Sequence, residues 1–194
     1  MTGAPDWAIG VSAGVHAAGC RDVVYVPDNP LSHILRILVA EYPEIRLALA
    51  TREEEAFGIA AGLYLGGRRP AVLLQSSGLG NSLNAVTSLL LPYRIPVLTI
   101  VSMRGDEGEW NAAQMPMGRA VRAILDSIGV PHATVASGET ARETVQRAAA
   151  DAFSMRVMHA CLLPKLLTAK PGADPRVSSA PANRGGMGSD PAFR

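Results

Sequence analysis

Residues 53–102 decide the fold, and they read EEEAFGIAAGLYLGGRRPAVLLQSSGLGNSLNAVTSLLLPYRIPVLTIVS. An acidic triplet opens a stretch of small residues with helical character, and paired glycines end it. A continuous apolar run then predicts a buried strand, and a Gly-rich turn predicts the start of the next helix. The expected elements are a helix over 53–65, a strand over 71–75, a helix over 79–90 and a strand over 96–102.

The same alternation continues on both sides of this stretch. The flanking helices are expected at 5–18, 31–42, 117–128 and 140–154, and the flanking strands at 22–26, 45–50, 131–135 and 156–163. Strands joined by helices of this length imply right-handed crossovers and a parallel sheet covered on both faces. We therefore expect an α/β fold, a three-layer α/β/α domain over residues 3–165. The Pro-, Gly- and Ser-rich segment 168–194 has no periodicity and reads as a disordered tail.

Bulk properties exclude several classes of protein. A net charge of +1 and 5% aromatic residues give no reason to expect nucleic acid or an anionic membrane as a partner. The longest apolar run, 89–101, is too short and too interrupted by proline and arginine to span a bilayer. Cys20 and Cys161 lie in no metal-binding pattern, so we expect two reduced thiols, no metal site and a cytoplasmic protein.

The acidic triplet at residues 53–55 has two interpretations. Acidic residues in the first turn of a helix complement the helix dipole and need no further role. However, Ala56, Gly58 and Gly62 leave the following helix surface almost without side-chain bulk. Two helical glycines cost roughly 1 kcal/mol each relative to alanine, and such a surface admits a second backbone or a flat ligand. A carboxylate beside it could share a proton with a ligand nitrogen.

The turn after the second buried strand also has two interpretations. Residues 75–82, QSSGLGNS, place glycines, hydroxyls and amides directly at a strand end, where backbone N–H groups can face a ligand. They lack the lysine of a phosphate loop and the GxGxxG spacing of a dinucleotide fold. Taken alone, they are equally compatible with an ordinary strand-to-helix turn.

Together, the two motifs resemble a known family. REEEAFGIAAGLYLGG followed by LLQSSGLGNSLNAVTSLL is similar to the pyrimidine-binding domain of thiamine diphosphate enzymes. Within that family, these sequence motifs are most similar to those of the sulfopyruvate decarboxylases, and the phosphonopyruvate decarboxylases are the next most similar. VYVPDNPL near the start and RGDEGEWNAAQMPMGRA after residue 103 strengthen the resemblance, which covers roughly residues 5–165. The short chain favours the sulfopyruvate type, in which this domain is a separate alpha subunit.

The resemblance implies thiamine diphosphate as the cofactor and a 2-oxo acid as the substrate. The family's catalytic glutamate, which bonds N1′ of the cofactor aminopyrimidine, aligns with Glu53, or with Glu54 if the alignment slips by one. Neighbouring helical residues point about 100° apart, so only one glutamate can face the ring. Further cofactor-binding residues are expected in the turn, at Ser77, Gly78, Leu79, Gly80 and Asn81.

Substrate contacts are expected in two other segments. Asp28 and Asn29 lie in the VPDNP turn after the first strand, although both are also ordinary turn formers. Gln114 lies where the subgroup places polar residues, but the neighbouring Met115 replaces a frequent histidine. Arg104 is a candidate partner for a sulfonate or phosphonate, as is Arg119, because a guanidinium binds such groups with two donors.

The Gly-Asp-Gly motif that holds Mg²⁺ and the diphosphate in this family does not occur in the 194 residues. The resemblance therefore implies a homo- or hetero-oligomeric enzyme in which a beta subunit carries the metal and the diphosphate. We expect the 56–62 and 83–91 surfaces to be buried in that contact. The expected reaction converts sulfopyruvate to sulfoacetaldehyde and CO₂. The alternatives are a phosphonopyruvate decarboxylase subunit, another thiamine diphosphate carboligase, or a non-catalytic scaffold.

Overall fold

The computed structural model describes residues 3–169. Six strands form one sheet in the order β2-β1-β3-β4-β6-β5, and every pair of neighbours is parallel. The strands are β1 Asp22–Tyr25, β2 Arg46–Leu49, β3 Pro70–Gln75, β4 Leu98–Ser102, β5 His132–Thr134 and β6 His159–Leu163. The expected parallel α/β sheet is confirmed. The expected tail lies outside the described residues, apart from 168 and 169.

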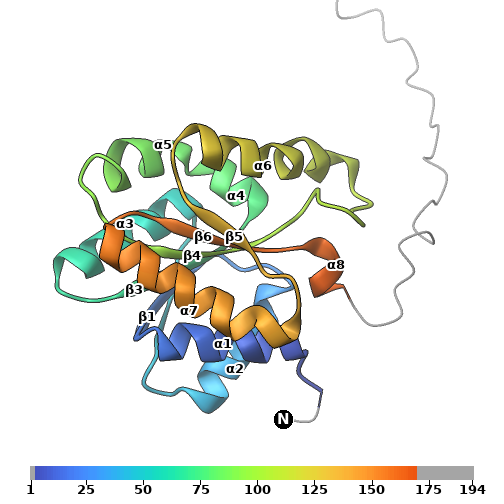
Figure 1. Ribbon diagram of the computed structural model, residues 1–194, viewed down its shortest axis with the longest axis horizontal. Coiled ribbons are helices and arrows are strands. Elements are labelled where there is room, and N and C mark those ends of the chain that lie inside the picture. Colours follow the sequence, from blue (N-terminus) through green and yellow to red (C-terminus); the bar gives the residue numbers. More distant parts are fainter. Residues whose placement is uncertain (1–2, 170–194) are drawn as a thin grey trace, which may run out of the picture.

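Helices cover both faces of the sheet, as Figure 1 shows. One face packs against α1 Asp6–Ala17, α2 Leu31–Glu41 and α7 Gly138–Met155. The other face packs against α3 Glu53–Leu65, α4 Ser76–Asn81 and α6 Met115–Ser127. The short helical elements include the 3-10 turn η2 Ala112–Gln114 and α8 Lys165–Thr168. The central strands β3 and β4 are buried because both of their faces are covered.

The expected single helix over 79–90 is wrong in its start and its continuity. Helix α4 begins at Ser76, directly after β3, so the expected Gly-rich turn is itself helical. The segment then continues as α5 Leu83–Ala85 and a π-helix, η1 Val86–Leu90. The interruption falls at Ser82, whose buried hydroxyl donates to the carbonyls of Gly78 (2.9 Å) and Leu79 (3.1 Å). Such bonds from a side chain to the preceding turn compete with the regular helix and bend it.

Helices α1 and α7 approach each other closely because α1 presents glycine at the contact. A Cβ atom at Gly14 would lie 2.7 Å from Val145 Cβ, and one at Gly10 would lie 2.8 Å from Ala141 Cβ. Both partner side chains are fully buried. The small residues of α1 therefore set the distance between the two helices on this face of the sheet.

We expect Gly14→Ala to destabilise the protein by about 1 to 3 kcal/mol, since the added methyl overpacks a filled contact. Urea unfolding of the full chain measures the change. The matched control is Gly62→Ala on α3, where an added Cβ meets nothing within 4 Å. That control should be neutral or stabilising, because alanine is the better helix former. Equal unfolding free energies for the two variants would contradict the close α1–α7 contact.

Candidate active site

The candidate site lies at the carboxyl edge of the sheet, where the strand order changes direction between β1 and β3. The chain passes from β1 outward to β2 and then returns across β1 to β3. In parallel α/β sheets, ligands bind outside the strand ends at this position. The segments that follow β1, β2, β3 and β4 supply Asp28, Glu53, Ser76 and Arg104 to this edge.

The three glutamates at the start of α3 have different surroundings. Glu55 is exposed and accepts hydrogen bonds from the backbone N (2.7 Å) and Oγ1 (2.6 Å) of Thr51, which lower the pKa of its carboxyl. Glu54 pairs with Arg52 Nε at 2.7 Å and accepts a bond from Asn81 Nδ2 at 2.9 Å. Glu53 has no cationic partner among the described residues. Glu54 and Glu55 therefore organise the start of the helix.

Glu53 lies directly against Gly78 of α4. A Cβ atom at Gly78 would lie 2.3 Å from Glu53 Cγ and 2.4 Å from Glu53 Oε1, so only glycine fits there. Asn81 Nδ2 lies 3.3 Å from the other carboxylate oxygen of Glu53. The structure thus brings together Glu53, Gly78 and Asn81 from two segments that are separated by β3.

The remaining residues of the α4 motif have mixed surroundings. Leu79 is fully buried in the core cluster on the α3 face of the sheet, and Ser77 is half-buried. A Cβ atom at Gly80 would lie 2.7 Å from Met117 Sδ, so this glycine makes room for α6. The sequence-based expectation of an open turn over 75–82 is therefore wrong, because residues 76–81 lie within α4.

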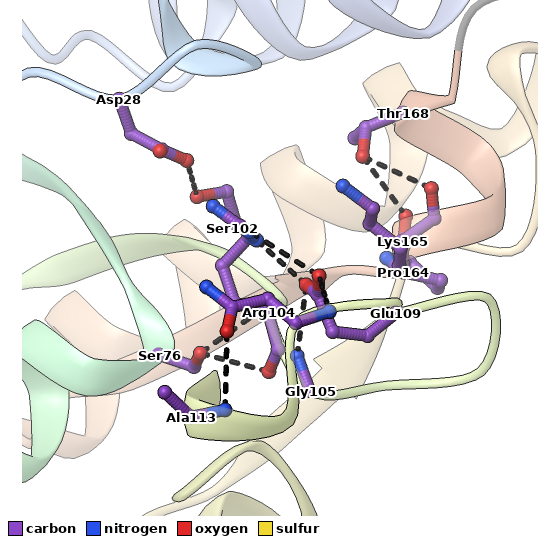
Figure 2. Close-up of polar contacts among 11 residues, drawn as sticks. Asp28, Ser76, Ser102, Arg104, Gly105, Glu109, Ala113, Pro164, Lys165 and Thr168 are labelled. Atoms are coloured by element: carbon purple, nitrogen blue, oxygen red, sulfur yellow. Dashed lines mark hydrogen bonds and ion pairs between the residues drawn. The ribbon is translucent and has the colours of Figure 1, made fainter. Parts of the chain in front are cut away.

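Asp28 and Ser102 form a bridge over the end of β3. Ser102 Oγ donates to Asp28 Oδ2 at 2.5 Å (Figure 2). Asp28 follows β1 and Ser102 ends β4, and these two strands lie on opposite sides of β3. Gln75, the last residue of β3, lies in register with Ser102, and its side-chain Oε1 is buried without a partner in the described structure. Asn29 is exposed, and its backbone carbonyl accepts a bond from Ser32 Oγ at 2.7 Å.

Arg104 and Glu109 form a bidentate ion pair in the segment after β4 (Figure 2). Arg104 Nε lies 2.7 Å from Glu109 Oε2, and Arg104 Nη2 lies 3.2 Å from Glu109 Oε1. Glu109 also accepts backbone bonds from Gly105 (3.3 Å) and Asn111 (3.0 Å). Burial raises the pKa of Glu109, but the bonds from Arg104, Asn111 and Gly105 outweigh it and lower the pKa to about 2.

The Arg104 segment is tied to the rest of the site through the main chain. Ser76 Oγ donates to the Arg104 carbonyl and accepts from the Arg104 backbone N–H, both at 3.0 Å. The sequence reasoning selected Arg104 but missed Ser76, Ser102 and Glu109. A carboxylate five residues after an arginine in a Gly-rich segment, as in RGDEGE, was the available signal for the ion pair.

Gln114 and Arg119 border the same segment. The Gln114 backbone carbonyl packs so closely on Gly105, at φ 75°, that a Cβ there would lie 2.1 Å from it. The Gln114 side chain makes no hydrogen bond with another described residue. Arg119 is exposed and forms no ion pair within residues 3–169, and it lines a cavity of about 300 Å³ with Gly105, Glu109 and Met115.

Two negative findings apply to residues 3–169. No cluster of three or more His, Cys, Asp or Glu side chains there is arranged to hold a metal ion. No helix in that range is long and apolar enough to cross a membrane.

Burial raises the pKa of both free cysteine thiols, Cys20 and Cys161, to about 12, so neither is a reactive thiolate.

We expect Glu109 to contribute stability that depends on pH. Its pKa is lower in the folded state, so the contribution is present above about pH 4.5 and is lost as the pH falls toward 2. Glu109→Gln should lose on the order of 2 to 3 kcal/mol at neutral pH and show a flatter stability curve between pH 5 and pH 2. Unfolding in urea across this pH range measures both effects. Glu107→Gln, at an exposed position in the same segment, is the control, and matching curves for the two variants would contradict the ion pair's role.

Comparisons with known proteins agree with this arrangement. Residues 10–114 match the model of the thiamine pyrophosphate enzyme, N-terminal TPP binding domain. A solved 2-oxoglutarate:ferredoxin oxidoreductase from Magnetococcus marinus shares the fold with a TM-score of 0.68 at 14% identity, over 84% of this chain and 29% of that one.

Curated relatives are more similar in sequence. The sulfopyruvate decarboxylase subunit alpha of Methanothermobacter thermautotrophicus is 46% identical over 135 residues, covering 70% of this chain and 81% of the relative. That of Methanococcus maripaludis is 38% identical, covering 77% and 89%. The phosphonopyruvate decarboxylase of Streptomyces viridochromogenes is 39% identical, covering 65% of this chain but only 31% of the relative. The chain therefore belongs to the thiamine pyrophosphate enzyme family, as a member that carries the N-terminal TPP-binding domain.

Proposed function

We propose that this chain is the alpha subunit of a two-subunit, thiamine diphosphate-dependent decarboxylase that converts sulfopyruvate to sulfoacetaldehyde and CO₂. The observation that carries the proposal is similarity over most of the length of two separate sulfopyruvate decarboxylase alpha subunits, at 81% and 89% coverage. The phosphonopyruvate decarboxylases align over only 31% and 25% of their length, and the sulfopyruvate decarboxylase of Methanosarcina acetivorans aligns over 35%, so partial coverage does not separate the two substrates.

The residues at the sheet edge fit the pyrimidine half of the cofactor. Gly78 leaves room for the Glu53 carboxylate, and the Asn81 amide supports it from the other side. When bound, thiamine diphosphate supplies the carbon nucleophile and the electron sink for loss of CO₂. We propose that Glu53, Ser77, Gly78, Leu79, Gly80 and Asn81 form the wall that holds the pyrimidine.

Glu53 is the proposed catalytic residue, whose carboxyl group would bond N1′ of the aminopyrimidine. The surroundings of its neighbours support this choice over Glu54 and Glu55. Glu55 uses one oxygen for two bonds to Thr51, and Glu54 is paired with Arg52. Glu53 makes no ion pair within the described part of the chain, so its carboxylate is available to a ligand.

Asp28, Asn29, Gln114 and Arg104 are the proposed substrate-side residues. Asp28 is held by Ser102, and the Arg104 segment is held by Ser76, so the two are fixed relative to the same strand ends. Arg104 directs Nε and Nη2 to Glu109 and retains Nη1 for a substrate oxygen. Arg119 faces the neighbouring cavity without an ion pair among residues 3–169 and is the better candidate for the sulfonate.

We propose that a beta subunit supplies the Gly-Asp-Gly motif, Mg²⁺ and the diphosphate site. One surface of α3 suits such a contact, because an added Cβ at Gly58 or Gly62 meets nothing within 4 Å and Leu65 is 76% exposed. The part of 56–62 that can contact a partner is smaller than the sequence predicted. Ala56, Ala60 and Ala61 pack into this chain's own core, so they are not available to a partner.

Replacing the three glutamates separately tests the catalytic assignment. In the reconstituted enzyme, Glu53→Gln should lower kcat by about 10² to 10⁴-fold, as expected for loss of a proton-transfer group. CO₂ release under saturating cofactor is the measurement. Glu55→Gln should keep most of the activity, because Glu55 only caps the helix. A large loss in Glu54→Gln with an active Glu53→Gln would shift the assignment to Glu54.

Co-expression with a chain that carries Gly-Asp-Gly tests the reaction. The purified complex should release CO₂ from sulfopyruvate in preference to phosphonopyruvate and pyruvate, and only with Mg²⁺ and thiamine diphosphate present. Preference for phosphonopyruvate would select the related decarboxylase instead. A stable complex that releases no CO₂ from any of the three acids would favour a carboligase or a scaffold, and full activity of this chain alone would contradict the two-subunit proposal.

A further inference from the structure

A second cavity lies between α7 and the edge strand β5, away from the site described above. It has a volume of about 380 Å³, within the range that small ligands occupy. Side chains of α7 form one wall and β5 forms the other, with His159 of β6 among the lining residues. Figure 1 shows α7 running across β5 and β6. The cavity runs along the whole of β5, and because His132 and His159 begin their strands, its His159 end lies toward the amino ends, opposite the edge that carries Glu53.

His159 is the unusual feature of this cavity. Its exposed fraction is 6%, and both ring nitrogens are buried with no hydrogen-bond partner in the described structure. Its side chain points to the α7 face, since it lies in register with Leu98, and Leu98 belongs to the core on that face. A buried polar group without a partner costs free energy, so two such atoms on one ring call for a ligand that pairs with them.

The charges around the ring indicate what kind of ligand fits. Burial lowers the pKa of His159, against the opposing effect of Asp151, so the ring is neutral at physiological pH and offers one donor and one acceptor. Asp151 of α7 lines the cavity, and its carboxylate forms no hydrogen bond or ion pair with any described residue. Among the other titratable groups of the lining, Glu143 and Arg147 neutralise each other at 2.6 Å, and His132 lies 3.8 Å from Asp126, outside the cavity. The cavity therefore carries one unpaired negative charge beside a neutral hydrogen-bond acceptor.

We propose that this cavity binds a small molecule that carries a primary ammonium group. The ammonium N–H groups would pair with the Asp151 carboxylate and with the acceptor nitrogen of His159, and an oxygen of the same molecule, such as the ethanolamine hydroxyl, would accept from the other ring nitrogen. A small anion is disfavoured by Asp151. A metal ion is disfavoured because no three-ligand cluster occurs in the described part of the chain. This site is separate from the proposed decarboxylase site, so the proposal does not depend on the reaction.

The test is binding of ethanolamine to the full chain near neutral pH. Isothermal titration calorimetry measures the affinity, and the ¹⁵N chemical shifts of the His159 ring report the contact. Ethanolamine should bind and move a ring ¹⁵N resonance. Choline, which has a positive charge but no N–H, should not bind. Asp151→Asn should weaken binding by at least about tenfold, as for loss of a charged hydrogen-bond partner. Glu107→Gln is the control, since Glu107 is exposed in the segment after β4 and does not line the cavity.

His159→Phe removes both ring nitrogens and should abolish binding. If His159→Phe does not fold, Asp151→Asn still tests the proposal. Three results would overturn the proposal: no heat and no His159 shift with ethanolamine, equal binding of choline, or unchanged affinity in Asp151→Asn. None of these readouts uses decarboxylase activity.

Discussion

The parallel direction of all six strands is the constraint on which the site depends. It brings the segments after β1, β2, β3 and β4 to one edge, although they are spread from residue 26 to residue 111. The change in strand order between β1 and β3 then opens that edge to a ligand. Every residue proposed for the cofactor or the substrate lies in these segments or directly after them.

Close backbone contacts fix the geometry at this edge. Gly78 admits the Glu53 carboxylate, and Gly80 admits Met117. In the segment after β4, Gly105 admits the Gln114 carbonyl while the Arg104–Glu109 pair ties the segment into one unit. All of these contacts are made within this chain, and close packing of this kind holds functional groups in fixed positions.

The two ends of the sheet present different chemistry. The carboxyl edge carries acidic and amide groups that are mostly paired with one another, as in Asp28–Ser102 and Glu54–Asn81. Toward the amino end, the cavity beside α7 contains His159 and Asp151, which lack such partners in the described structure. Buried polar atoms without a partner in the described structure, Gln75 Oε1 at the carboxyl edge and the His159 ring near the amino end, motivate two separate ligand sites.

The sequence by itself determined the α/β class and the alternation of strands and helices along the chain. It also identified Glu53 and the 77–81 motif as candidate cofactor-binding residues. Apolar periodicity and glycine position are local properties, so they can be read along the chain. The tertiary structure adds support for Glu53 over Glu54 and Glu55 as the proposed catalytic residue, because Thr51, Arg52, Gly78 and Asn81 surround the three carboxylates differently. It also revealed that α4 begins at Ser76 and that Arg104 is paired with Glu109. Both depend on contacts that form only when the chain has folded, such as the bonds between Ser76 and Arg104, 28 residues apart.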